Sequence, residues 1–265
     1  MSNPFFSVIT PTLNSGRTIE KCLESVSLQE NSLFEQLIID GGSEDQTAEI
    51  CNKYIDSNNL KIYNNKVKGI YKAINEGIKN AKGEFIILLN SDDWLFEKNT
   101  LAKAKGVILR NKDLKDIFVF KSKISDGSKY LGSINYNNNY KLPIQKLPFS
   151  HGAMIVRKIF FEHNFMYDEN YSLSSDLDFL NKVEKEKICF YNQEIHCFSI
   201  KGQSSLSFRG IFESRNIALK YGKSNFSTNL DFSKAILNKV LIITLGIKNL
   251  ILIKSILRIR GIWKL

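Results

Sequence analysis

Two adjacent carboxylates, Asp92 and Asp93, follow the apolar segment 85–89 after only two residues, Asn90 and Ser91. Two negative charges side by side at the end of a buried strand repel each other, and burying them is costly unless a cation is present. Carboxylate sites favour Mg²⁺ or Mn²⁺, which are commonly shared with the phosphates of a substrate. Alternatively, one of the pair merely caps the helix that follows, because Asp is a favoured N-cap residue.

Repeated strand and helix signals surround this pair. Short apolar runs predict strands at 5–10, 36–40, 60–63 and 84–89. Helical spacing and a capping box predict helices at 17–28, 43–54 and 70–80. Strands that alternate with helices at this spacing predict an α/β fold, with a mostly parallel sheet covered by helices on both faces.

Polar residues follow three of the predicted strands. Asn14 comes after the first strand, Asp40 with Gly41 after the second, and Asp92–Asp93 after the fourth. Ligands bind parallel sheets at the carboxyl ends of the strands, so we expect these residues to line one edge. Asp40 is suited to bind a base or ribose, and it is equally compatible with a tight turn through the glycines. This convergence favours a ligand site at Asp92–Asp93 over a helix cap.

The second half of the chain is less regular. It predicts strands at 118–122, 154–156 and 188–191, a helix at 177–183, and a long loop at 127–141. Asp176 and Asp178 stand at the start of that helix, where Asp176 is a candidate general base or an N-cap. Such a base would take a proton from an attacking hydroxyl, and a cation at the acidic pair would neutralise a leaving phosphate group.

Other chemistries find less support in the residues. The sequence has neither GxGxxG nor GxxxxGK[ST], so neither a dinucleotide-binding Rossmann site nor a P-loop is indicated. The three histidines are too dispersed for a zinc site, and residue types alone leave His151 and His196 as surface or core residues. The four cysteines lack CxxC spacing and are expected to be free thiols.

Four motifs together resemble the family 2 glycosyltransferases. They are VITPTLN at 8–14, IIDGGSEDQT at 38–47, KGIYKAIN at 68–75 and LNSDD at 89–93. The resemblance covers about residues 5–210 and is strongest to the bacterial branch that builds O-antigen, capsule or colanic-acid-type polysaccharides. It implies a GT-A fold for residues 1–233, with a donor half at about 1–115 and an acceptor half at about 116–233.

The resemblance also implies a reaction. An inverting hexosyl- or N-acetylhexosaminyltransferase would use a UDP-, GDP- or dTDP-sugar, Mg²⁺ or Mn²⁺, and a saccharide acceptor that we expect to be lipid-linked. The donor-binding residues it implies are Thr10, Pro11, Asn14, Asp40, Gly41, Lys68 and Asp92.

The same resemblance implies a role for each of several individual residues. Asp93 would bind the metal, Asp92 would contact the ribose or diphosphate, and Asp176 would be the general base. On the acceptor side it implies His151, Gly202 and Ser204. The chain differs from many relatives at Gly152, where glutamine often follows the histidine.

The basic excess of the chain lies at its end. The net charge is +10, but residues 234–265 hold seven Lys/Arg and no acid, which leaves 30 basic against 27 acidic residues elsewhere. We therefore expect no nucleic-acid partner. No uncharged run here reaches the roughly 18 residues of a membrane span. The pattern predicts an amphipathic helical tail on an anionic membrane surface, with packing on the catalytic domain or a homodimer interface as the alternative.

The start of the chain lacks the features of a signal peptide, so we expect a cytoplasmic protein, peripheral on the inner face of a bacterial plasma membrane. Three rival functions fit less well. A sugar nucleotidyltransferase would carry a Gly/Arg/Lys-rich phosphate loop after the first strand, and the sequence has none. A non-catalytic basic membrane- or nucleic-acid-binding protein would lose binding on deletion of residues 234–265 and would show no nucleotide-sugar affinity in the rest of the chain. A glycosidase would need a pair of carboxylates but neither a metal nor a nucleotide pocket, and three acidic strand ends fit it poorly.

Overall fold

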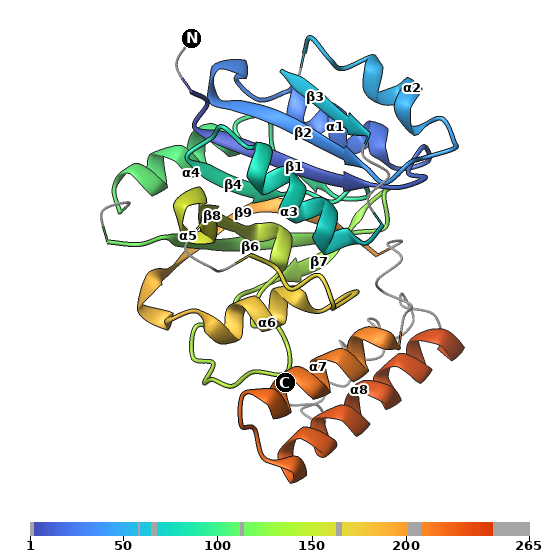
Figure 1. Cartoon of the computed structure of the whole chain (residues 1–265), viewed down its shortest axis with the longest axis vertical. Coiled ribbons are helices and arrows are strands. Elements are labelled where there is room, and N and C mark those ends of the chain that lie inside the picture. The colour runs from blue at the N-terminus through green and yellow to red at the C-terminus, as the bar shows by residue number, and fades with distance from the viewer. Residues whose placement is uncertain are drawn as a thin grey trace.

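A computed structural model describes residues 3–245, apart from 58, 65–67, 112–113, 163–165 and 201–207. Its described part is built on a nine-stranded sheet in the order β3-β2-β1-β4-β8-β6-β9-β5, with β7 paired to β6 (Figure 1). The strands are β1 (Phe6–Thr12), β2 (Phe34–Asp40), β3 (Leu60–Asn64), β4 (Phe85–Leu88), β5 (Trp94–Leu95), β6 (Ile117–Ser125), β7 (Tyr130–Ile134), β8 (Met154–Arg157) and β9 (Ile188–Ser199).

Helices cover both faces of the sheet. They are α1 (Ile19–Ser27), α2 (Thr47–Asn52), α3 (Ile70–Asn80), α4 (Thr100–Leu109), α5 (Lys158–Glu162), α6 (Ser175–Lys182), α7 (Arg209–Lys220) and α8 (Asn225–Leu245). Successive residues of a strand point to opposite faces. Accordingly Val8 packs in the cluster that includes Val26 of α1, whereas Ile9 packs in the cluster that includes Ile74 of α3. The predicted α/β class with helices on both faces is confirmed.

The donor half has the predicted parallel arrangement. β1 pairs with β2 and β4, and β2 pairs with β3, all in parallel, so Ile9 lies between Leu37 and Leu88. The carboxyl ends of β1, β2 and β4 therefore reach one edge of the sheet. β8 then runs antiparallel between β4 and β6, and the acceptor half is mixed.

Two local predictions are wrong. The segment 127–141 is not wholly a loop, because Tyr130–Ile134 forms β7 against β6. The capping box predicted at Ser43 does not form either. α2 begins at Thr47, and the Ser43 hydroxyl instead donates a hydrogen bond of 2.6 Å to Asp40 Oδ1. The side chain of Ser43 is thus bound to the carboxylate at the strand end and does not cap the helix.

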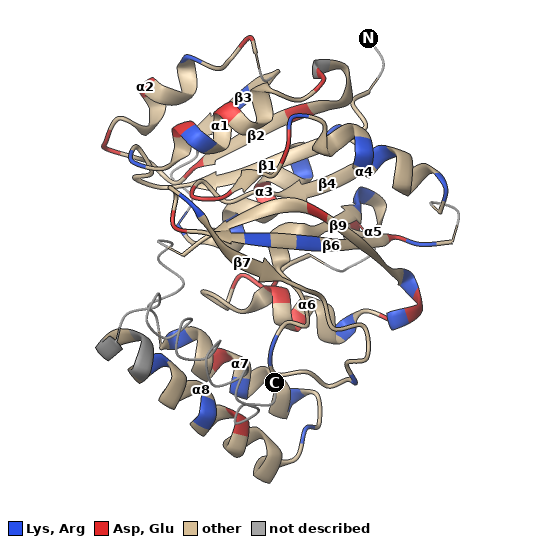
Figure 2. Ribbon diagram, turned by 180° about the vertical axis from the view of Figure 1, so that it is seen from behind, with Lys and Arg blue, Asp and Glu red and all other residues tan. Residues whose placement is uncertain are grey.

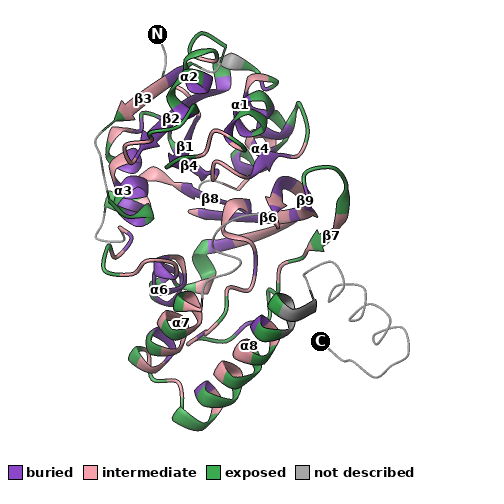
Figure 3. Cartoon of the chain, turned by 90° about the vertical axis from the view of Figure 1, so that its right-hand side faces the viewer, coloured by how far each residue is buried: buried purple, intermediate pink, exposed green. Residues whose placement is uncertain are grey.

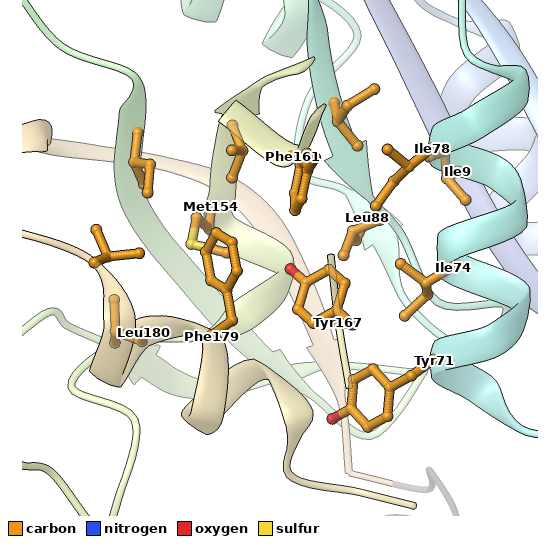
Figure 4. Close-up of a cluster of buried hydrophobic side chains, with 14 of the residues drawn as sticks. Ile9, Tyr71, Ile74, Ile78, Leu88, Met154, Phe161, Tyr167, Phe179 and Leu180 are labelled. Carbon is orange, nitrogen blue, oxygen red and sulfur yellow. The ribbon is translucent and has the colours of Figure 1, made fainter. Parts of the chain in front are cut away.

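One hydrophobic cluster joins the donor and acceptor halves. It contains Ile74 and Leu88 from the donor half together with Met154, Tyr167 and Phe179 from the acceptor half (Figure 4). The rings of Tyr167 and Phe179 lie 5.2 Å apart. Because buried apolar contacts are close-packed, this shared core holds residues of the two halves in a defined relative position.

The last two described helices, α7 and α8, lie side by side, and the rings of Phe212 and Phe232 meet at 5.1 Å (Figure 1). The predicted start of the tail at 234 falls inside α8, and residues 246–265 lie outside the described residues. Among the described helices, none is both long and apolar enough to cross a bilayer. The cysteines are free, as predicted.

Candidate active site

Three loops meet at the carboxyl edge of the donor half. The loop after β1 is tied to the loop after β2 by two contacts of Asn14. Its backbone N–H donates to Ser43 Oγ at 2.8 Å, and its side-chain Oδ1 accepts from the N–H of Glu44 at 2.9 Å. Ser15 Oγ lies 2.8 Å from Ser91 Oγ in the loop after β4. The predicted convergence of these loops is therefore present, with Asn14 exposed at the edge.

Asp40 closes the turn after β2. Its Oδ1 accepts hydrogen bonds from the backbone N–H groups of Gly42 and Ser43, at 3.2 and 3.0 Å. Gly42 has φ +96°, a conformation that glycine adopts without strain. The N–H of Gly41 donates to the carbonyl of Thr12 at 2.9 Å. The expected tight turn is present, and contact of Asp40 with a nucleotide base stays a prediction.

Two other predicted donor residues lie deeper. Thr10 and Pro11 are buried inside β1, where Thr10 Oγ1 accepts a hydrogen bond from Gln36 Nε2 at 3.2 Å. Both residues therefore belong to the sheet itself and not to the three loops at its edge. Lys68 is exposed and precedes Gly69, whose φ of +110° starts the turn into α3.

Asp92 and Asp93 differ sharply in their surroundings. Asp93 is 2% exposed, and its Oδ1 accepts a hydrogen bond from the N–H of Ser199 at 2.8 Å. Its Oδ2 accepts from Asn90 Nδ2 at 3.2 Å. Asp92 is only partly buried, and no side chain of the described residues donates a hydrogen bond to it. Burial, followed by the negative charge of Asp93, raises the pKa of Asp92 to about 6.

His196 is a site residue that residue types alone did not identify. It lies on β9 and is 1% exposed, with Nε2 3.2 Å from Asp93 Oδ2 and Nδ1 2.9 Å from Ser122 Oγ. Its imidazole therefore lies against the inner carboxylate of the acidic pair, and Nε2 makes no hydrogen bond to the described residues. The strand predicted at 188–191 extends to Ser199 and so includes His196, but the pairing that places Leu95 opposite His196 was not available from the sequence.

Asp176 lies in a second cluster of polar side chains. Its Oδ1 accepts hydrogen bonds from the N–H of Leu177 at 2.8 Å and from the Tyr71 hydroxyl at 3.2 Å. Its Oδ2 lies 4.0 Å from His151 Nδ1, and His151 Nε2 lies 2.9 Å from the Tyr167 hydroxyl. Burial raises the pKa of Asp176 and lowers that of His151. The carboxylate and imidazole are thus each shifted toward their neutral forms.

Gly152 brings the two clusters together. It follows His151 in the 3-10 turn His151–Ala153, and a Cβ built on it would lie 2.3 Å from His196 Nε2. Real Cβ atoms do not approach so closely, so the glycine leaves the space that the His196 ring fills. This packing explains why no larger residue stands after His151. It also places the Asp93–His196 pair beside the His151–Asp176 cluster.

The second acidic residue near the start of α6, Asp178, is structural. Asp178 is fully buried and forms ion pairs with Lys182 at 2.6 Å and Lys220 at 2.8 Å. Burial alone would raise the pKa of Asp178, but these two ammonium groups outweigh it and hold the pKa below its usual value. Asp178 therefore ties α6 to α7. Gly202 and Ser204, predicted on the acceptor side, lie outside the described residues.

Solved glycosyltransferases share this fold. TarS 1–349 of S. aureus, in complex with UDP-GlcNAc, superimposes with a TM-score of 0.65 at 23% identity, over 89% of this chain and 72% of that one. The mannosyltransferase PcManGT from Pyrobaculum calidifontis, in complex with GDP-Man and Mn²⁺, gives 0.57 at 13% identity, over 100% and 77%. Against a longer TarS structure the chain spans 43% of the length. The fold is that of the GT-A glycosyltransferases.

Sequence comparison then identifies the family. Residues 7–166 match the model of glycosyl transferase family 2, and the protein belongs to that family. The PGL/p-HBAD biosynthesis glycosyltransferase of Mycobacterium bovis is 30% identical over 185 residues, which cover 68% of this chain and 69% of the relative. The poly(ribitol-phosphate) beta-N-acetylglucosaminyltransferase TarS of Staphylococcus aureus is 36% identical over 126 residues, 46% of this chain and 22% of TarS.

Proposed function

We propose that this enzyme transfers a sugar from a nucleoside-diphosphate donor to a hydroxyl of a saccharide acceptor, in the synthesis of a bacterial surface polymer. The observation that carries the proposal is that the acidic pair Asp92–Asp93, through the His196 ring packed against Gly152, lies beside the His151–Asp176 cluster in a GT-A fold. In support, the relatives named above are a PGL/p-HBAD biosynthesis glycosyltransferase and a poly(ribitol-phosphate) beta-N-acetylglucosaminyltransferase, and two of the structural neighbours are in complex with UDP-GlcNAc or GDP-Man. A lipid-linked acceptor is part of the same proposal.

In the proposed reaction Asp176 is the general base. The acceptor oxygen attacks the anomeric carbon and forms the new C–O bond, while the bond from that carbon to the phosphate oxygen breaks and its electron pair leaves with the diphosphate. The acceptor proton passes to Asp176 Oδ2, the oxygen that faces His151. A single displacement of this kind inverts the anomeric configuration.

The acidic edge fits a divalent cation. Mg²⁺ is usually bound by one or two carboxylates plus substrate phosphates and keeps several waters, so a dedicated cage of protein ligands is not required. The described residues contain no cluster of three or more His, Cys, Asp or Glu suited to a metal. A bound Mg²⁺ or Mn²⁺ would supply positive charge against the leaving diphosphate.

Within this proposal the metal ligand is Asp92. Asp93 was the residue implied by family resemblance, but both of its oxygens already accept hydrogen bonds, Oδ1 from the N–H of Ser199 and Oδ2 from Asn90 Nδ2. Asp92 carries the more accessible carboxylate and no side-chain donor from the described residues. The proposed role of Asp93 is to hold the loop after β4 to β9.

The reaction products distinguish this function from sugar activation. Incubation of the enzyme with candidate sugar nucleotides, Mn²⁺ and membrane-extracted acceptor is expected to release nucleoside diphosphate. Products are separated by anion-exchange chromatography. Release of pyrophosphate from a nucleoside triphosphate and a sugar phosphate would contradict the proposal and identify a sugar nucleotidyltransferase.

We further propose that α8 places the enzyme on an anionic membrane surface. Phe226, Leu230 and Leu237 recur at helical spacing and are 83%, 47% and 61% exposed. Figure 3 shows how much of α8 is exposed, and Figure 2 shows basic residues on both α7 and α8. Together with the acid-free, basic composition of 234–265, this apolar stripe matches a helix that lies in the headgroup region.

Vesicle binding tests the membrane proposal. Leu230→Glu is expected to reduce co-sedimentation of the full chain with phosphatidylglycerol–phosphatidylcholine vesicles at least about tenfold, because it puts a negative charge in the apolar stripe. Leu109→Glu is the matched control, since Leu109 on α4 is 46% exposed. Equal binding by both variants would contradict the proposal. So would a dimer in solution that Leu230→Glu converts to monomer, which would assign the stripe to a second copy.

A further inference from the structure

Tyr71 reaches the candidate base from the other half of the molecule. It is the second residue of α3, in the donor half, and its side chain is 4% exposed. Its ring stacks on Tyr167 with centroids 5.6 Å apart. Figure 4 shows Tyr71 extending from α3 across the shared core, on the side where Tyr167 and Phe179 lie. The ring is therefore fixed by its attachment to α3 and by its stacking on Tyr167, so the hydroxyl has a defined position.

The hydroxyl of Tyr71 is directed at one oxygen of Asp176. Oδ1 of Asp176 accepts from Tyr71 at 3.2 Å and from the N–H of Leu177 at 2.8 Å. Two donors on the same oxygen fix the rotation of the carboxylate and leave Oδ2 toward His151. Oδ2 is consequently the oxygen that is available to receive a proton.

We infer that Tyr71 is a positioning residue for the general base, and that its hydroxyl aims Oδ2 of Asp176 at the acceptor. This inference rests on the proposed function, in which Asp176 takes the acceptor proton. A hydrogen bond to a carboxylate stabilises the charged form, so Tyr71 also keeps Asp176 ionised to a lower pH. This hydrogen bond connects the start of helix α3, in the donor half, to the proposed general base in the acceptor half.

The electrostatic surroundings are consistent with this role. Burial, with Asp176 next in importance, raises the pKa of Tyr71 well above its usual value, so the phenol stays protonated and remains a donor. Three titratable groups of the described residues face Asp176: Tyr71 from α3, His151 from the 3-10 turn before β8, and Tyr167 from the segment before α6. Of these, Tyr71 donates directly to the carboxylate.

The test is Tyr71→Phe, which keeps the ring that stacks on Tyr167 and removes only the hydroxyl. We expect kcat to fall about tenfold. We also expect the acid limb of the pH profile of kcat/KM to move up by about one pH unit, since one pKa unit corresponds to a tenfold change in the protonation equilibrium of Asp176. The limb moves upward because loss of the donor raises the pKa of Asp176. The KM for the donor is expected to stay unchanged.

Tyr140→Phe is the matched control. Tyr140 is 7% exposed and belongs to the same hydrophobic cluster, and its hydroxyl has no hydrogen-bond partner among the described residues. Its removal should leave both kcat and the acid limb in place. A folded Tyr71→Phe enzyme whose acid limb coincides with that of Tyr140→Phe would overturn the inference, whatever its kcat.

Asp176→Asn, measured in parallel, separates this inference from the proposed function. If Asp176→Asn loses turnover while Tyr71→Phe retains the wild-type profile, only the role of Tyr71 fails. If Asp176→Asn itself keeps full turnover, the proposed base is wrong and the role of Tyr71 fails with it.

Discussion

Asp176→Asn is expected to lower kcat by about 10²- to 10⁴-fold, the contribution that a positioned general base typically makes. Asparagine has nearly the same shape and accepts hydrogen bonds from Tyr71 and Leu177 as the carboxylate does, but it does not take a proton. The affinity for the donor should change little, because Asp176 lies in the acceptor-side cluster. Steady-state kinetics with a titrated donor and a saturating acceptor measure both quantities.

The pH dependence gives this prediction a second readout. Burial raises the pKa of Asp176, and the base acts only when it is deprotonated. Wild-type kcat/KM should therefore rise with pH through a value above the ordinary range of an aspartic acid, and the residual activity of Asp176→Asn should lack that limb. Retention of full turnover, or of the same limb, by the folded variant would contradict the assignment.

The donor half was largely predictable from its sequence. Its strands are continuous apolar runs because both faces of the parallel sheet are buried, and its helices are strongly periodic because each buries one face. The parallel order then places Asn14, Asp40 and Asp92 at one edge by geometry alone. The local error at Ser43 arose because its oxygen, which in a capping box would accept from a helix N–H, accepts from the N–H of Asn14, while its hydroxyl donates to Asp40.

The acceptor half was less predictable because its site depends on contacts between distant segments. Asp176 was recognised as a candidate, but its hydrogen bond to Tyr71 joins residues 105 positions apart. The contact of His196 with Asp93 likewise depends on the pairing of β5 with β9. Periodicity describes a helix or strand by itself and contains no information on which distant element it meets.

Asp92→Asn is the second substitution with a large expected effect. It removes one negative charge at the edge where we place the cation and preserves the size of the side chain. The affinity for the nucleoside diphosphate in the presence of Mn²⁺ should fall at least about tenfold. Substitution of residues that merely support a metal ligand already lowers metal affinity by about that factor. Asp93→Asn should instead lower the thermal stability, because Asp93 is buried against Ser199 and His196.

The central claim is that the donor diphosphate is held through a divalent cation at Asp92. Calorimetric titration of UDP, GDP and dTDP into the wild-type enzyme and into Asp92→Asn, with and without Mn²⁺, tests it most directly. We predict that one nucleotide binds the wild type, that Mn²⁺ tightens this binding, and that Asp92→Asn abolishes the Mn²⁺ effect. Equal tightening by Mn²⁺ in wild type and Asp92→Asn, or tight binding that Mn²⁺ does not change, would contradict the claim.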